Sequence, residues 1–139
     1  MPDTDQPQTP RSRRLANLRS TVALILGIVF LGTGITKLAG MPWIVQTFRD
    51  WGYPPWFRIV VGLVETAGGV LVLIPATRVL GATLVSLVMV GAIGTHVLAG
   101  QWGMVPVPVV TLALALLLVS ALRPRFEGFP SVGDAPPRG

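Results

Sequence analysis

The chain contains no cysteine and only one histidine, His96. Without cysteine it can form no disulfide and no thiolate metal site, which excludes the thiol oxidoreductases among four-helix membrane proteins as functional relatives. A catalytic metal usually takes three protein ligands, and one histidine leaves such a set incomplete, so we expect no metal site. A haem with two axial histidines cannot form within one chain for the same reason.

Charged residues are also scarce. They make up 12% of the 139 residues, whereas 51% of the residues are hydrophobic. Soluble domains carry about 25% charged residues, so this chain has too little polar surface to coat a soluble fold, and the composition predicts an integral membrane protein surrounded by lipid. The basic residues are scattered without an interleaved aromatic platform, and we expect no nucleic-acid partner.

Four apolar runs are long enough to cross a membrane, since each is close to the ~20 residues that span ~30 Å of hydrocarbon. They cover residues 22–39, 56–75, 79–99 and 104–122. Short, proline-marked connections require neighbouring helices to be antiparallel, and open strands are excluded in lipid. The sequence therefore predicts an all-α, antiparallel four-helix bundle as one domain over residues 21–123. The proline- and charge-rich segments 1–20 and 124–139 are expected to be disordered tails.

Lysine and arginine are distributed unevenly between the two sides of the predicted bundle. Because cytoplasmic loops carry the excess of these residues, we expect a multi-pass protein of the cell (inner or plasma) membrane with both termini in the cytoplasm. The richer side holds seven basic residues, Arg11, Arg13, Arg14, Arg19, Arg78, Arg123 and Arg125, and the other side holds three, Lys37, Arg49 and Arg58. The first run is longer than the core of a typical signal peptide and no A-x-A site follows it, so we expect it to remain a helix.

The first outer loop, residues 40–57, has a pattern of its own. Trp43, Ile44, Thr47 and Phe48 recur near helical spacing, which predicts a short interfacial helix in this loop. All four tryptophans and the single tyrosine, Tyr53, fall on this side of the bundle. Two interpretations remain open: an aromatic belt at the depth of the lipid headgroups, or a lid over a cavity in the outer half of the bundle.

Each of the first three predicted helices carries one ionisable side chain on a face of small or flexible residues. These side chains are Lys37, Glu65 and His96. Helical spacing places Gly27, Phe30 and Gly34 on the face of Lys37, and Gly62, Thr66 and Gly69 on the face of Glu65. Small residues let helices approach closely, and an intramembrane charge normally faces the bundle interior and has a partner. We therefore hypothesise that Lys37 and Glu65 pair beside a cavity.

Other interpretations of these three residues stay open. The ammonium of Lys37 could instead reach the outer headgroups along its extended stem. Glu65 could make only a structural hydrogen bond inside the bundle. For His96 we favour a neutral imidazole bonded to a backbone carbonyl or to the third loop, residues 100–103, over direct contact with Glu65.

An ordered set of short motifs resembles the DoxX-like family of small membrane proteins. The motifs are Phe30-x-x-x-Gly34-x-x-Lys37-Leu38, Trp51-Gly52-Tyr53-Pro54, Gly62-x-x-Glu65 and Thr95-His96, and the resemblance covers about residues 22–122. It implies a four-helix bundle and marks Gly34, Lys37, Glu65 and His96. Some relatives are subunits of redox systems, including a thiosulfate:quinone oxidoreductase, whereas similar eukaryotic proteins act as chaperones or cargo receptors. The family therefore does not decide the function by itself.

Three functions compete. The first is a subunit or scaffold of a membrane redox complex, with a non-covalently bound quinone that Lys37 or His96 could hydrogen-bond and Trp51 or Trp56 could stack on. The second is a non-enzymatic chaperone or assembly factor, in which the polar residues only stabilise the bundle. The third is a small proton-coupled transporter that uses Glu65. Whether the chain is an enzyme, which proteins it meets, and whether it associates with copies of itself are left open.

Overall fold

The computed structural model describes residues 10–122, which form helices and turns and contain no strand. The four long helices are α1 (Pro10–Leu38), α3 (Pro55–Leu73), α4 (Arg78–Leu98) and α5 (Pro106–Leu122). A short helix, α2 (Pro42–Asp50), lies between the first two of them, and single 3-10 turns at Pro75–Thr77 and Trp102–Met104 make the other connections. The prediction of an all-α four-helix bundle with a short helix in the first outer loop is confirmed.

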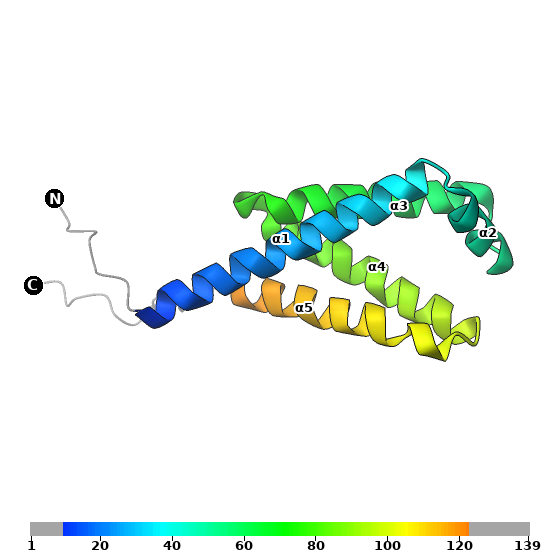
Figure 1. The fold of residues 1–139 in the computed structure, drawn as a ribbon. Coiled ribbons are helices and arrows are strands. Elements are labelled where there is room, and N and C mark those ends of the chain that lie inside the picture. The colour runs from blue at the N-terminus through cyan, green and yellow to red at the C-terminus, as the bar shows by residue number, and fades with distance from the viewer. Residues whose placement is uncertain (1–9, 123–139) are drawn as a thin grey trace, which may run out of the picture.

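The four long helices form two pairs (Figure 1). α1 packs along α3, and α4 packs along α5, while α3 meets α4 and α1 meets α5 where the pairs join. Figure 1 shows the pairs diverging toward the end that carries α2. We call this end, with α2 and the Trp102–Met104 turn, the open end, and the opposite end, with the Pro75–Thr77 turn, the closed end.

The buried apolar core occupies the side of the bundle toward the closed end. Its members come from all four long helices: Ala23, Leu26, Phe30, Val72, Ala82, Val85, Met89, Ala115, Leu118 and Val119. Many other large apolar side chains are exposed on the outside of the bundle, as expected where lipid is the solvent. By length and composition, four helical segments could cross a membrane, namely 13–38, 55–73, 75–98 and 102–121.

The helix boundaries follow from proline and glycine. Proline occupies the first turns of α2 and α3, where its missing N–H has no intrahelical partner in any case. Gly40, just after α1, and Gly100, just after α4, have φ of +69° and +70°, the left-handed conformation in which helices commonly end and which glycine adopts without strain. These two turns reverse the chain at the open end.

The first helix is longer than predicted. α1 begins at Pro10, so residues 10–20 are helical and the expectation of a disordered tail over residues 1–20 is wrong for this part. The physical reason is that residues 11–20 contain arginine, leucine and alanine but no glycine or proline, so nothing interrupts the helix that starts at Pro10. The rest of the two predicted tails, residues 1–9 and 124–139, lies outside the described residues.

Glycines bring the backbones of α1 and α3 into contact. A methyl group on Gly34 would overlap Thr66 and would lie 2.9 Å from the carbonyl oxygen of Gly62. A methyl group on Gly69 would lie 2.8 Å from the amide nitrogen of Leu31, and Cβ atoms in proteins essentially never come this close to another heavy atom. The predicted small-residue faces of these two helices therefore do meet, and no larger side chain fits between them.

Candidate functional site

A cavity of about 750 Å³ lies between the two helix pairs toward the open end. Its wall is built by all five helices and is mostly apolar; Phe30, Phe57, Val88 and Met89 are among its lining residues. From α2, Ile44 and Phe48 are buried and also line the cavity. The short helix therefore covers the cavity, in agreement with the lid interpretation of the first outer loop.

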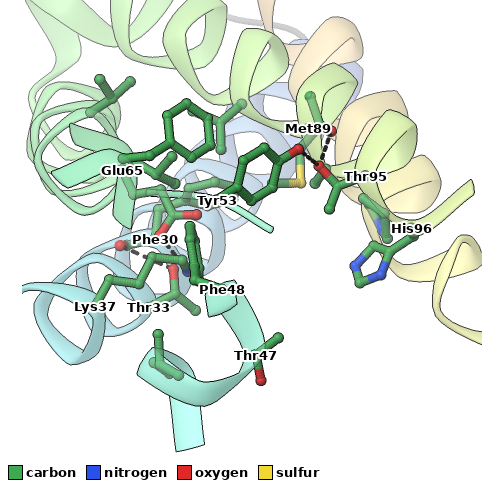
Figure 2. A pocket seen from close by; sticks show the side chains of 18 of the residues that line it. Phe30, Thr33, Lys37, Thr47, Phe48, Tyr53, Glu65, Met89, Thr95 and His96 are labelled. Carbon is green, nitrogen blue, oxygen red and sulfur yellow. Dashed lines mark hydrogen bonds and ion pairs between the residues drawn. The ribbon is translucent and has the colours of Figure 1, made fainter. Parts of the chain in front are cut away.

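An ion pair lies on the wall of this cavity. The ammonium nitrogen of Lys37 is 2.8 Å from Oε2 of Glu65, and the two side chains are 17% and 5% exposed. Figure 2 shows the two groups facing each other, Lys37 from α1 and Glu65 from α3. The structure therefore agrees with the interpretation in which Lys37 pairs with Glu65, and not with the one in which its ammonium reaches the outer headgroups.

The position of the pair follows from the glycine contact. Gly34 lies one turn before Lys37 in α1, and it contacts Gly62 and Thr66, which flank Glu65 in α3. The backbones are so close here that an ammonium on one helix reaches a carboxylate on the other. Burying either charge without the other would cost several kcal/mol, so the pair also stabilises the register of the two helices.

The carboxylate of Glu65 is not saturated by this contact. Oε2 is shielded from solvent and receives no well-directed hydrogen bond from the described residues, so its 2.8 Å contact with Lys37 is mainly attraction between charges. A carboxylate has about four acceptor sites and an ammonium has three donors. The pair therefore retains hydrogen-bonding capacity, and both of its residues line the cavity.

A second polar group lies on the opposite wall. The hydroxyl of Tyr53, which follows α2, is 2.7 Å from Oγ1 of Thr95 in α4 (Figure 2). Next to it, the rings of Trp51 and His96 meet edge to face, with centroids 5.4 Å apart and planes at 89°. These two contacts join the loop after α2 to α4, so we call them the clasp.

Among the described residues, His96 forms no hydrogen bond with Lys37 or Glu65. Its Nδ1 lies 2.9 Å from Oε1 of Gln101 in the third loop, as in the interpretation favoured from the sequence. In the described part of the chain, no three carboxylate or histidine side chains come together in a way that could hold a metal ion.

The structure brings together most, but not all, of the residues predicted for the site. Lys37, Glu65, His96 and Trp51 all line the cavity. Trp56 does not, because its side chain is 61% exposed on the outside of the bundle and packs edge to face on Phe57. Of the predicted structural motif, Phe30 lines the cavity, and the others lie where α1 and α3 meet: Gly34, Gly62, Thr66 and Gly69.

Sequence reasoning missed the polar contact in the clasp. The sequence motifs contain Tyr53 and Thr95 but do not predict their contact, which joins residues 42 positions apart in the chain. The signal that could have found them is the single tyrosine of the chain, which stands beside Trp51 in a loop and needs a partner for its hydroxyl if it is buried.

The fold and the buried pair define a small multi-pass membrane protein of four transmembrane helices. Residues 21–118 match the DoxX-like family, and the chain belongs to this family. A protein of Bacillus subtilis (strain 168) named "Putative oxidoreductase CatD" is 40% identical over 73 residues, which are 52% of this chain and 54% of that protein. The chain thus spans about half the length of the curated relative it matches. No solved structure matches the chain.

Proposed function

We propose that this protein is a subunit of a membrane redox complex, and that its cavity binds a small quinone-type molecule taken from the lipid. The observation that carries this proposal is the Lys37–Glu65 pair on the wall of a mostly apolar cavity. Binding sites for small molecules are typically apolar hollows of 300–1,000 Å³ with a few polar groups that orient the ligand. An intramembrane charge is in addition a functional candidate in its own right.

The surroundings of the pair suit an aromatic ring. Phe30, Phe48 and Phe57 line the same cavity and offer ring faces and edges, and the Lys37 ammonium is a hydrogen-bond donor for a ring oxygen. The chain has no cysteine, so electrons would pass through the bound ligand and a partner protein. The name of the Bacillus subtilis relative, an oxidoreductase, is consistent with this proposal but describes that protein.

The test is to purify the protein with its surrounding lipid and to identify bound quinones and partner proteins by mass spectrometry. Gly91→Phe provides the blocking variant, because Gly91 lines the cavity and a Cβ there has no atom within 4 Å, so the ring can enter the cavity without a clash. Gly94→Phe is the matched control, since Gly94 lies on the same helix in equally open space but does not line the cavity.

We expect close to one quinone per protein in the unmodified chain and in Gly94→Phe, and a loss of at least tenfold in Gly91→Phe. A chain that carries no quinone, or one that carries it equally in both variants, would refute the proposal. Stable partner proteins without a quinone would instead favour the scaffold or assembly function.

A further inference from the structure

We infer that the group bound at the Lys37–Glu65 pair is an aromatic hydroxyl, as in a hydroquinone or a phenol with an apolar tail. This inference deepens the proposed function and rests on it in one respect, that the same cavity is a ligand site. It differs in naming the chemical form of the ligand. The pair selects the hydroxyl form over forms of the same ring that can only accept hydrogen bonds.

The first step is the complementarity of hydrogen bonds. On this wall an ammonium, which can only donate, lies 2.8 Å from a carboxylate, which can only accept. A hydroxyl group accepts through its oxygen and donates through its hydrogen, so one O–H can bond Lys37 and Glu65 at once. A quinone carbonyl or an ether oxygen accepts from Lys37 but places its own lone pairs against the carboxylate.

The second step is accessibility. Lys37 keeps 17% of its side-chain surface exposed, and the 5% that Glu65 keeps does not belong to Oε2, which is fully shielded. Both residues line the cavity, so part of each side chain borders the space that a ligand would fill. Oε2 itself is shielded, so a ligand hydroxyl would donate to the other carboxylate oxygen of Glu65, Oε1, and would add a hydrogen bond to the carboxylate there.

The third step is charge. The positive charge of the Lys37 ammonium and the negative charge of the Glu65 carboxylate already cancel, so a neutral ligand leaves the net charge of the site at zero. A fatty acid or a phosphate headgroup would bring a negative charge next to Glu65, and an amine would bring a positive charge next to Lys37, and both are costly in a low-dielectric cavity. The pair therefore disfavours charged lipid headgroups.

The fourth step is the apolar remainder of the ligand. Phe48 and Met89 are buried in the wall and suit an aromatic ring. Val60, Leu87 and Val107 also line the cavity, yet they are 44%, 68% and 67% exposed. The cavity is thus open toward the lipid between the diverging pairs, and an alkyl tail can leave it there.

The test compares two probes, 4-decylphenol and 4-decylanisole, which differ only in that a methyl group replaces the hydroxyl hydrogen. Binding is measured by equilibrium partition to the full-length protein in lipid nanodiscs, with empty nanodiscs subtracted. We expect the phenol to bind at least tenfold more tightly than the anisole. The variant Lys37→Met with Glu65→Leu should bring this ratio close to one, and Gly94→Phe should leave it unchanged.

The unmodified protein decides the outcome even if the double variant does not fold. Equal binding of the two probes, or tighter binding of the anisole, overturns the inference. A ratio that stays tenfold in a folded double variant also overturns it, because the selection would then come from another group. The failures are distinguishable: bound quinone with no preference for the phenol refutes this inference alone, and a clear preference in a protein without quinone or redox partner refutes the proposed function alone.

Discussion

Lys37 near the end of α1 and Glu65 in the middle of α3 form an ion pair of 2.8 Å between the first two transmembrane helices. The pair depends on the contact of Gly34 with Gly62, since this contact brings the helix backbones close together one turn from the two side chains. One local feature, a glycine against a glycine, thus brings together the two charges of the candidate site.

The first prediction concerns the stability of this pair. Glu65→Leu should lower the free energy of unfolding by about 3 kcal/mol, because it leaves the Lys37 ammonium without its partner. Glu65→Gln should cost less, since the amide oxygen still accepts a hydrogen bond. Lys37→Met together with Glu65→Leu should recover part of the loss. Melting temperature and folded yield are measured in one detergent, and the unmodified protein, Lys37→Met, Glu65→Leu and the double variant form the double-mutant cycle.

Strictly additive losses in this cycle would mean that the two residues act independently, which the 2.8 Å contact argues against. Equal stability of the Gln and Leu variants would mean that Glu65 needs no polar partner.

The second prediction concerns orientation. α1 begins and α5 ends at the same end of the bundle, and the basic residues favour the cytoplasm for that end. Reporter fusions at residue 10 and after Arg125 should therefore both report a cytoplasmic location. A periplasmic or extracellular result from both would invert the bundle, and opposite results would contradict the four-span topology.

The third prediction concerns the joint between α3 and α4. A methyl group on Gly81 would overlap the backbone at Val72, whereas one on Gly94 of the same helix meets nothing within 4 Å. Gly81→Ala should therefore destabilise the protein by about 1–3 kcal/mol through overpacking. Gly94→Ala, the matched control, should be neutral or slightly stabilising, because alanine favours the helix. Thermal unfolding of the two variants in one detergent tests this, and equal melting temperatures would show that the joint is not tightly packed.

The fourth prediction concerns the clasp. Tyr53→Phe removes the hydrogen bond to Thr95 and should cost about 1 kcal/mol, enough to raise the open population of the lid roughly fivefold. Because the chain has no cysteine, a single Ala92→Cys reports access to the cavity. Its labelling by a maleimide should become several-fold faster in Tyr53→Phe.

The control for that experiment is Gln46→Cys, whose position is exposed on α2. Its labelling rate should not respond to Tyr53→Phe. An unchanged rate at residue 92 would mean that the clasp does not limit entry to the cavity.

Much of this architecture could be predicted because the sequence patterns are local. Four long apolar runs specify four helices, and the helical spacing of Gly34 with Lys37 and of Gly62 with Glu65 predicted the faces that meet. The N-terminal part of α1 differs from the prediction, because charge and proline near a terminus suggest disorder while residues 11–20 retain good helix formers. Trp56 lies nine residues before Glu65, which in a helix of 3.6 residues per turn is the opposite face of α3, so the same spacing could have predicted its outward position.

The contact between Tyr53 and Thr95 in the clasp could not be predicted from local sequence patterns. Tyr53 and Thr95 are distant in the chain, and their contact depends on the angle at which one helix pair leaves the other. No periodicity within a single helix contains that angle. The cavity itself is a consequence of the same angle, so its presence was only one of two interpretations of the aromatic loop.

The two main walls of the cavity are hairpins of long helices, α1 with α3, which α2 connects, and α4 with α5. Each hairpin can assemble from neighbouring segments as the chain enters the bilayer, with little cost in loop closure. The cavity belongs to neither hairpin and comes into being only when the second one docks on the first. A ligand that contacts both walls would therefore stabilise the docked arrangement of the two hairpins over the undocked one.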